Sequence, residues 1–477
     1  MTEQHRPHHD ATRSPSPSHS PAASPARGAH DAPETGEAPG TGEGPETHEA
    51  YEGFLSRGLA RVTAEAVAPY QTAVVRIGFA FTWLCFLLRE FPNRHELYGP
   101  DGPWSWKLAE RLTESNHAFT VLMWSDGAAW FEFVYALAVV ASVSVILGWR
   151  TRTASVIYMV GVLGLQNRSV FMGDGGDNVI HLMAMYVILT RCAEVWSLDA
   201  RRRRRRARAA EDAMAEGRPP SAARDTTGAV LWCVFGVIML VSTVGGALSV
   251  GWGVFFWVLW ASQAVWWAAE RYMPDSEART VCDMVANLVH NGALLVIVVE
   301  VCLIYSTAGW YKIQGSRWQD GTAVYYPMNL DYFSPWPELS SFLASSGLLI
   351  LMATYITVMV QVAFPFTLFN RRVKNVLLAA MIAEHMSIAV LLGLPFFSMA
   401  MIAADAVFLP TIALVWLGDR FRGGWERALG RLRPGRGHGT YDDGRDGAGG
   451  HGGEGPGDED SASPVPQQRS GDGVSVR

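Results

Sequence analysis

The sequence has few charged residues and few cysteines. Charged side chains make up 18% of the 477 residues and hydrophobic side chains 49%, a balance that excludes an ordinary soluble domain for the middle of the chain. The cysteines show no CxxC or Cys/His spacing, which excludes a disulfide framework and the common zinc sites, so no metal is predicted. They are expected to be small buried hydrophobic residues: Cys85, Cys192, Cys233, Cys282 and Cys302.

The two ends of the chain lack large apolar side chains. Residues 1–50 are rich in Pro, Ser, Ala, Gly, His and Glu, and residues 433–477 are rich in Gly, Asp and Arg. Such segments cannot bury enough apolar surface to offset chain entropy, so both tails are predicted to be disordered. The start also lacks the apolar stretch of a cleaved signal peptide, so the first apolar helix is expected to direct insertion.

Between the tails lie ten apolar stretches that approach the ~20 residues needed to cross a bilayer core. We therefore predict an all-α, polytopic membrane protein with about ten transmembrane helices. The third is the weakest because Gly161, Gly164 and Gln166 interrupt it, and the fifth and sixth are joined so closely that a re-entrant pair is an alternative. The approximate spans are 70–90, 128–148, 153–171, 177–196, 228–248, 250–269, 285–310, 342–365, 373–394 and 396–418.

Basic residues gather in loops that fall on one side if all ten spans cross. The positive-inside rule then places both termini in the cytoplasm of a bacterial cell membrane. The arginine run 201–206 is better explained by topology and contact with anionic lipid than by nucleic-acid binding. The basic segments are Arg150 and Arg152, Arg201 to Arg206 with Arg208, Arg271 and Arg279, Arg371 to Lys374, and Arg420 to Arg433.

A lysine and a polar, aromatic loop follow the seventh predicted span, at the outer face in this topology. Burial disfavours an ammonium ion, so a partly buried Lys312 could act as a base. Alternatively, Lys312 anchors the helix with its charge among the headgroups. An interfacial aromatic belt would explain the aromatic residues of this loop but not Gly315, Asp320 and Gly321. The aromatic residues are Trp310, Trp318, Tyr325, Tyr326, Tyr332 and Trp336.

This region resembles the HTTM family, the horizontally transferred transmembrane domain. The resemblance rests on Ala308-Gly309, Lys312, Gly315, Trp318, Asp320-Gly321-Thr322-Ala323 and Tyr325-Tyr326, and on a second stretch with His385, Gly393 and Pro395-Phe396-Phe397-Ser398-Met399. The family includes vitamin K-dependent gamma-carboxylase and bacterial proteins similar to sporulation-delaying protein B. The similarity covers roughly residues 65–420. It departs at 228–270, which we interpret as an added helical hairpin.

The resemblance implies a function and a site. It implies that Lys312 is the base that meets a reduced quinone, menaquinol or a vitamin K-like cofactor, with His385 as a second catalytic residue. Trp318, Glu384 and Glu300 are candidates for binding the cofactor. A secreted peptide or protein is the implied substrate. Because the carboxylase's large extramembrane domain has no counterpart here, the alternative is a non-carboxylating membrane protein in the maturation, export or immunity of a secreted peptide.

Other polar residues within the predicted spans have two interpretations. Arg76, His290-Asn291 and Asp405, like Glu300 and Glu384, could line a proton route or cofactor pocket, or could make interhelical hydrogen bonds. Asp177 is expected to cap the fourth helix, and Asp174 belongs to a glycine-rich turn. Asn167-Arg168-Ser169 matches a glycosylation sequon and lies near the place of an Asn-His pair in the carboxylase, but no histidine follows Asn167.

Overall fold

The computed structural model describes residues 56–219, 225–273 and 275–432, which form helices and turns without a strand. The prediction of an all-α chain is therefore confirmed for these residues. The predicted disorder of 1–50 and 433–477 falls outside the described residues. The described chain up to Leu414 forms one compact unit, and the residues from Val415 onward belong to a second unit.

The core of the first unit is formed by four helices that pack on one another. Trp83, Tyr135 and Tyr158 lie in this core with at most 2% of their surface exposed. Glycine permits the closest approach, because a Cβ at Gly161 would lie 2.8 Å from Cβ of Ala138. The four helices are α2 (Pro69–Glu90), α5 (Ala128–Leu147), α6 (Thr151–Arg168) and α7 (Gly175–Val187), and the short α3 (Arg94–Tyr98) and α4 (Trp106–Asn116) connect α2 to α5.

A basic helix and a helical hairpin follow the four-helix core. Helix α8 (Leu198–Ala215) carries the arginine run, and α9 (Thr226–Val244) pairs with α10 (Val250–Tyr272). The Trp232 and Trp260 rings stack with centroids 3.9 Å apart, and each indole N–H donates to the other residue's carbonyl oxygen at 3.1 and 3.0 Å. These bonds satisfy two indole donors inside an apolar pair of helices.

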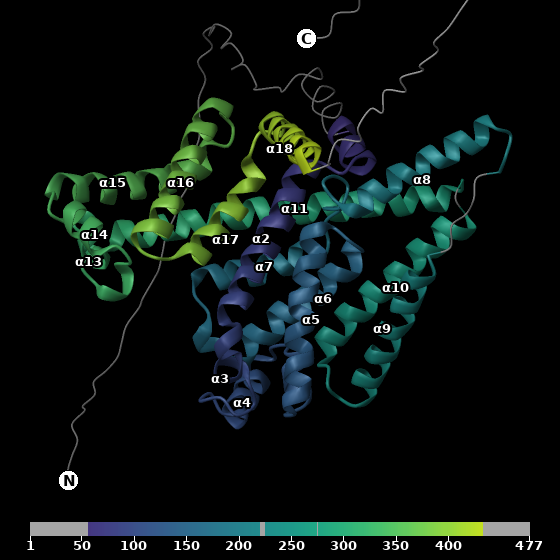
Figure 1. Cartoon of the computed structure of the whole chain (residues 1–477), viewed down its shortest axis with the longest axis horizontal. Helices are drawn as coiled ribbons and strands as arrows, with labels where there is room; N and C mark the ends of the chain where they lie inside the picture. The colour runs from purple at the N-terminus through teal and green to yellow at the C-terminus, as the bar shows by residue number, and fades with distance from the viewer. Residues whose placement is uncertain (1–55, 220–224, 274, 433–477) are drawn as a thin grey trace, which may run out of the picture. The chain divides into compact units, whose positions relative to one another are not determined.

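The 38-residue helix α11 (Glu277–Gln314) follows the hairpin of α9 and α10 and leads to the C-terminal helices of the first unit. It runs across the direction of α2, α5 and α6 rather than parallel to them (Figure 1). The remaining helices therefore do not extend a single parallel bundle. In chain order they are α12 (Ser316–Gln319), α13 (Tyr325–Met328), α14 (Pro337–Ala344), α15 (Gly347–Ala363), α16 (Arg371–Leu391), α17 (Pro395–Asp405) and α18 (Thr411–Leu432), which continues into the second unit.

Six helices of the described chain are long and apolar enough to cross a membrane, so the count of ten is not confirmed. A seventh qualifies if Pro395–Phe408 and Thr411–Gly424 form one bent span. The predicted span 396–418 is broken because Pro410 lacks the N–H that would continue a helix. Within the predicted span 177–196, the helix ends at Val187. This helix, α7, is only 13 residues long. The six are Pro69–Tyr98, Ala128–Leu147, Thr226–Val244, Glu277–Gln314, Gly347–Thr367 and Arg371–Leu391.

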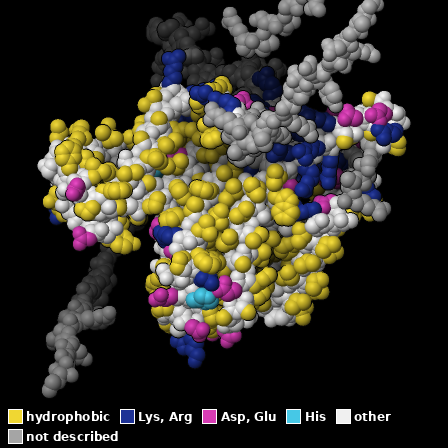
Figure 2. Space-filling view, in the orientation of Figure 1, with side chains coloured by type: hydrophobic (Ala, Val, Ile, Leu, Met, Phe, Trp, Pro, Cys, Tyr) yellow, Lys and Arg dark blue, Asp and Glu magenta, His cyan; other side chains and the backbone are white. Residues whose placement is uncertain are grey.

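The exposed surface of these helices is apolar. Only 6% of the most apolar stretch of α9 is buried, and Val237, Val241 and Val244 are more than 60% exposed. Hydrophobic side chains also cover much of the face that Figure 2 shows. Apolar surface of this extent is unfavourable in water and favourable in lipid. The helices therefore indicate a membrane protein.

All five cysteines are free thiols. Cys192 is buried, whereas Cys85, Cys282 and Cys302 are half-buried. Cys233 lies on α9 and is exposed, so the expectation of a buried residue is wrong for this cysteine. In an apolar helix with an exposed surface, a thiol can contact lipid as readily as protein.

Candidate functional site

A chain of three polar side chains connects α11, α15 and α16. The Lys312 ammonium donates to Oε1 of Gln361 at 2.7 Å, and Nε2 of Gln361 donates to Oε1 of Glu384 at 2.6 Å. Gln361 is buried, and Lys312 and Glu384 are half-buried. The amide of Gln361 therefore separates the lysine from the carboxylate instead of letting them form a direct ion pair.

A second polar cluster begins at the next residue of α16. The hydroxyl of Tyr305 donates to Oδ1 of Asp405 at 2.9 Å and lies 3.2 Å from Nε2 of His385. Tyr305, His385 and Asp405 are each at most 2% exposed. They come from α11, α16 and α17, so three helices contribute to one buried polar centre.

Polar atoms of this cluster remain without partners. Tyr305 donates its one hydroxyl hydrogen to Asp405, and its oxygen can accept from Nε2 of His385 in the tautomer that carries the proton on Nε2. Nδ1 is the other ring nitrogen of His385. It is buried without a hydrogen-bond partner among the described residues, as are Oδ2 of Asp405 and Oγ of Ser398. Buried polar side-chain atoms without a hydrogen-bond partner are unusual in a packed interior.

Aromatic rings and close helix packing surround the two clusters. The Tyr305 ring contacts Phe364 with centroids 6.0 Å apart, and the His385 ring contacts Phe397 at 5.6 Å. Gly309 lies between Tyr305 and Lys312 on α11, and a Cβ there would come within 2.6 Å of Cγ2 of Val362. This glycine allows α11 to approach α15 closely enough for Lys312 to reach Gln361.

The loop after α11 has a structural explanation for its glycine and aspartate residues. Gly321 adopts φ of +74°, and a Cβ there would lie 2.3 Å from Cδ1 of Leu351, so only glycine fits without displacement. Asp320 accepts hydrogen bonds from the amide and hydroxyl of Thr322. The motif therefore builds a tight turn against α15. Trp318 also contacts the lysine, with Nζ of Lys312 5.3 Å from its ring centroid.

The structure thus brings Lys312, Trp318, Glu384 and His385 into one region, whereas Glu300 does not join them. Glu300 is half-buried on α11 and makes no hydrogen bond or ion pair to the residues described. Sequence reasoning noticed Asp405 as an intramembrane carboxylate but did not select Tyr305 or Gln361. The spacing of Tyr305, Gly309 and Lys312 places all three on one helix face. This spacing alone gives Tyr305 no role, and it does not include Gln361.

The other polar residues within the predicted spans serve the fold. The buried guanidinium of Arg76 donates to the carbonyl oxygens of Val145, Ile146 and Trp196 at the end of α5 and beyond it. The side chains of His290 and Asn291 bind backbone groups between Val62 and Val67. These contacts support the interpretation as interhelical and capping hydrogen bonds.

The residues before and within the fourth predicted span are also structural. Asp174 caps α7 and Asp177 completes a reciprocal capping box with it, so the cap lies three residues before the expected one. Asn167 donates to the carbonyl oxygen of Phe119 at 2.8 Å. Arg168, which is 1% exposed, donates to the carbonyl oxygens of Gly99 and Trp104.

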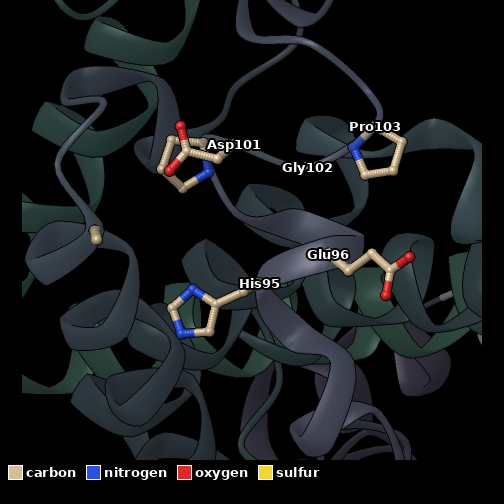
Figure 3. Close-up of a pocket in the computed structure, with 7 residues that line it drawn as sticks. His95, Glu96, Asp101, Gly102 and Pro103 are labelled. Atoms are coloured by element: carbon tan, nitrogen blue, oxygen red, sulfur yellow. The ribbon is translucent and has the colours of Figure 1, made fainter.

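A pocket of about 230 Å³ lies elsewhere in the first unit, at the connection between α2 and α5. Figure 3 shows His95, Glu96, Asp101, Gly102 and Pro103 around it. His95 is engaged by Glu132, with Nε2 2.6 Å from Oε1. None of the residues that line this pocket belongs to either polar cluster, so it is separate from the candidate site.

Comparison of the chain with models of protein families, with curated proteins and with solved structures finds no match. The resemblance to the HTTM family therefore stays a prediction from the residues quoted above.

Proposed function

We propose that the chain is a membrane enzyme that uses a reduced quinone, with Lys312 as its base. The observation that supports this most is the partner of Lys312. Its ammonium contacts a neutral amide, Gln361, and an indole, Trp318, rather than a carboxylate. A lysine without a paired anion in half-buried surroundings loses its proton more easily than one in an ion pair.

The surroundings suit a lipid-soluble hydroquinone. Such a molecule needs a polar partner for its hydroxyl group and apolar surroundings for its ring and tail. Lys312 and Glu384 provide polar groups, and α11 and α15 also carry exposed apolar side chains, namely Trp310, Ile313 and Met352. A reduced quinone, when bound, would supply the reducing equivalents for the reaction.

Each polar residue would then have a distinct task. Nζ of Lys312 would accept a hydroxyl proton, while the carbonyl oxygen of Gln361 orients Nζ through their hydrogen bond. Glu384 would keep the Gln361 amide from rotating, since it accepts from Nε2. His385 would be a second proton acceptor through Nδ1, in the tautomer that carries the ring proton on Nε2.

The test of this function is anaerobic purification of the full chain in detergent, followed by quinone analysis and oxygen uptake with reduced menaquinone. We expect bound quinone and quinol-dependent oxygen uptake in the wild type. Lys312→Ala should lose most of the uptake, because general-base catalysis typically contributes a factor of about 10²–10⁴. Lys107→Ala, at an exposed lysine of α4, is the matched control.

Two results would overturn the proposal. Folded wild-type protein that carries no quinone and takes up no oxygen would favour the alternative, a non-carboxylating protein that handles a secreted peptide. Unchanged uptake in both Lys312→Ala and Lys312→Arg would remove Lys312 from its assigned role. Carboxylation of a secreted peptide is a separate question, and its test is the incorporation of labelled bicarbonate into the peptide.

We further propose that both termini face the cytoplasm and that ten segments cross the membrane. These are the six apolar helices, α6, α7, α10 and the bent pair Pro395–Phe408 and Thr411–Gly424. Helices α5 and α6 are joined by a short turn and pack on each other, as do α9 and α10, so partners in a hairpin would cross together. The test is labelling of single cysteines from each side of the membrane. Labelling of residues 201–208 only from outside would reject this orientation.

A further inference from the structure

Three arginines from distant parts of the chain surround one tryptophan. Trp266, near the end of α10, has the guanidinium carbons of Arg279, Arg152 and Arg191 at 4.5, 4.7 and 5.8 Å from its ring centroid. Arg152 is in the first turn of α6, Arg191 follows α7, and Arg279 is in the first turn of α11. The fold therefore collects cations that the sequence separates widely.

The carboxylates nearby do not balance these cations. Asp283 pairs with Arg279 at 3.0 Å and lies 3.5 Å from Arg191. Glu194 pairs with Arg191 and with Arg203, each at 3.2 Å. These two carboxylates pair with Arg191, Arg203 and Arg279. Arg152 has no carboxylate within ion-pair distance in the described chain, although Glu270 and Glu194 act on it at longer range. Three carboxylates therefore face four arginines.

Hydrogen-bond donors also remain unused at this cluster. Nη1 of Arg279 is buried and has no partner among the described residues. Arg152, which is exposed, makes no hydrogen bond to them either, and its guanidinium contacts Trp266. Guanidinium groups that repel one another and carry free N–H groups are stabilised by an anion that accepts several hydrogen bonds, and phosphate does so well.

The cluster lies where apolar helices end. Arg279 is the third residue of the candidate span Glu277–Gln314, and Arg152 lies five residues after the candidate span Ala128–Leu147. Figure 2 shows Lys and Arg side chains gathered on the side of the molecule that carries α8, beside the hydrophobic surface. Basic residues and tryptophan at helix ends lie at the level of lipid headgroups.

We propose that Arg152, Arg191, Arg279 and Trp266 form a binding site for a phosphate-bearing anion, supplied by the headgroup of an anionic phospholipid. Arg152 and Nη1 of Arg279 donate to the phosphate oxygens, and Trp266 holds the guanidinium groups by stacking. Arg203 of the arginine run is occupied by Glu194 and by the carbonyl oxygen of Ala193, so the run borders this site rather than forming it.

The test is native mass spectrometry of the full chain in detergent with added phosphatidylglycerol or phosphatidylcholine. We expect phosphatidylglycerol to be retained in preference, and Arg152→Gln to weaken its binding about tenfold, the size expected for one lost charge-assisted hydrogen bond. Arg279→Gln should act similarly. The matched control is Arg208→Gln, at an exposed arginine of α8, which should change binding less than about twofold.

The folding of the variants and the effects of the control and of phosphate decide whether the proposed site stands. Because Arg152 has no ion-pair partner to lose, Arg152→Gln is expected to fold even if Arg279→Gln does not, and a thermal melt checks this. Equal loss in Arg208→Gln, or no loss in Arg152→Gln, would overturn the site. Displacement by inorganic phosphate at equal concentration, without a preference between the two lipids, would overturn the lipid headgroup as the source and assign the site to free phosphate.

Discussion

Nζ of Lys312 lies 2.7 Å from Oε1 of Gln361, and this amide, not a carboxylate, is its hydrogen-bond partner. The same amide donates to Glu384, so one neutral side chain connects a cation and an anion across three helices. Removing a bridge of this kind leaves two polar groups without their partner in half-buried surroundings.

Gln361→Leu should therefore destabilise the protein by about 1–3 kcal/mol, the cost of leaving buried polar groups unsatisfied. The measurement is thermal unfolding in detergent followed by circular dichroism. Gln314→Leu, at an exposed glutamine near the end of α11, is the control and should change stability by less than about 0.5 kcal/mol. Equal effects of the two substitutions would argue against the bridge.

Tyr305→Phe should cost a similar amount, about 1–3 kcal/mol, because Asp405 loses the one hydrogen bond that its side chain makes in the described chain. Combining Tyr305→Phe with Asp405→Asn tests their coupling in a double-mutant cycle, which should give an interaction energy of about 0.5–3 kcal/mol. Tyr311→Phe, at a residue of the same helix that is 75% exposed, should be close to neutral. Additive effects at Tyr305 and Asp405 would show that the bond contributes little.

Gly309→Val should separate α11 from α15, because a Cβ at this position meets Cγ2 of Val362 at 2.6 Å. We expect a loss of about 1–3 kcal/mol from overpacking and a loss of quinone if the site depends on this contact. Gly292→Val is the matched control in the same helix, since no atom lies within 4 Å of a Cβ there. The explanation fails if the two variants unfold at the same temperature.

Acid should weaken the attachment of α9 through Asp225, which caps that helix. Two hydrogen bonds from Arg150, at 2.6 and 3.0 Å, hold the pKa of Asp225 below its usual value of 3.8. A carboxyl with a lowered folded-state pKa contributes stability above its unfolded pKa and loses that contribution as the pH falls through the folded-state pKa. The contribution is therefore present at pH 6 and decreases below about pH 4.

Asp225→Asn should accordingly differ from the wild type at pH 6 and differ less from it at pH 3. The difference should stay within about 1 kcal/mol, since 42% of the Asp225 side chain is exposed and solvent screens the pair. Thermal melts at the two pH values measure it, with Asp126→Asn at an exposed aspartate as the control. A difference that grows toward low pH would contradict the sign worked out here.

Much of the helical architecture could be predicted from the sequence. The apolar runs at 70–90, 128–148 and 373–394 correspond closely to α2, α5 and α16, because long apolar stretches form helices wherever lipid or protein covers them. The count of ten spans could not be secured in this way. Hydropathy does not reveal that a helix stops after 13 residues, as α7 does, or that Pro410 breaks the last span.

The candidate site, like the helical architecture, could be predicted from the sequence only in part. Lys312, Glu384 and His385 were identifiable as polar residues in apolar surroundings, where each is costly and so has a reason to be present. Tyr305 and Gln361 were not, because tyrosine and glutamine are common in such helices and acquire a role only through their partners.

The sequence by itself therefore determined an all-helical chain with several apolar helices, which indicates a membrane protein, and the local spacing that puts Tyr305, Gly309 and Lys312 on one face of α11. These features depend on hydropathy and helical periodicity, which neighbouring residues specify. Only the tertiary structure decided that Gln361 separates Lys312 from Glu384, and that Arg152, Arg191 and Arg279 meet at Trp266. Such contacts join residues far apart in the chain, and their formation depends on how whole helices pack.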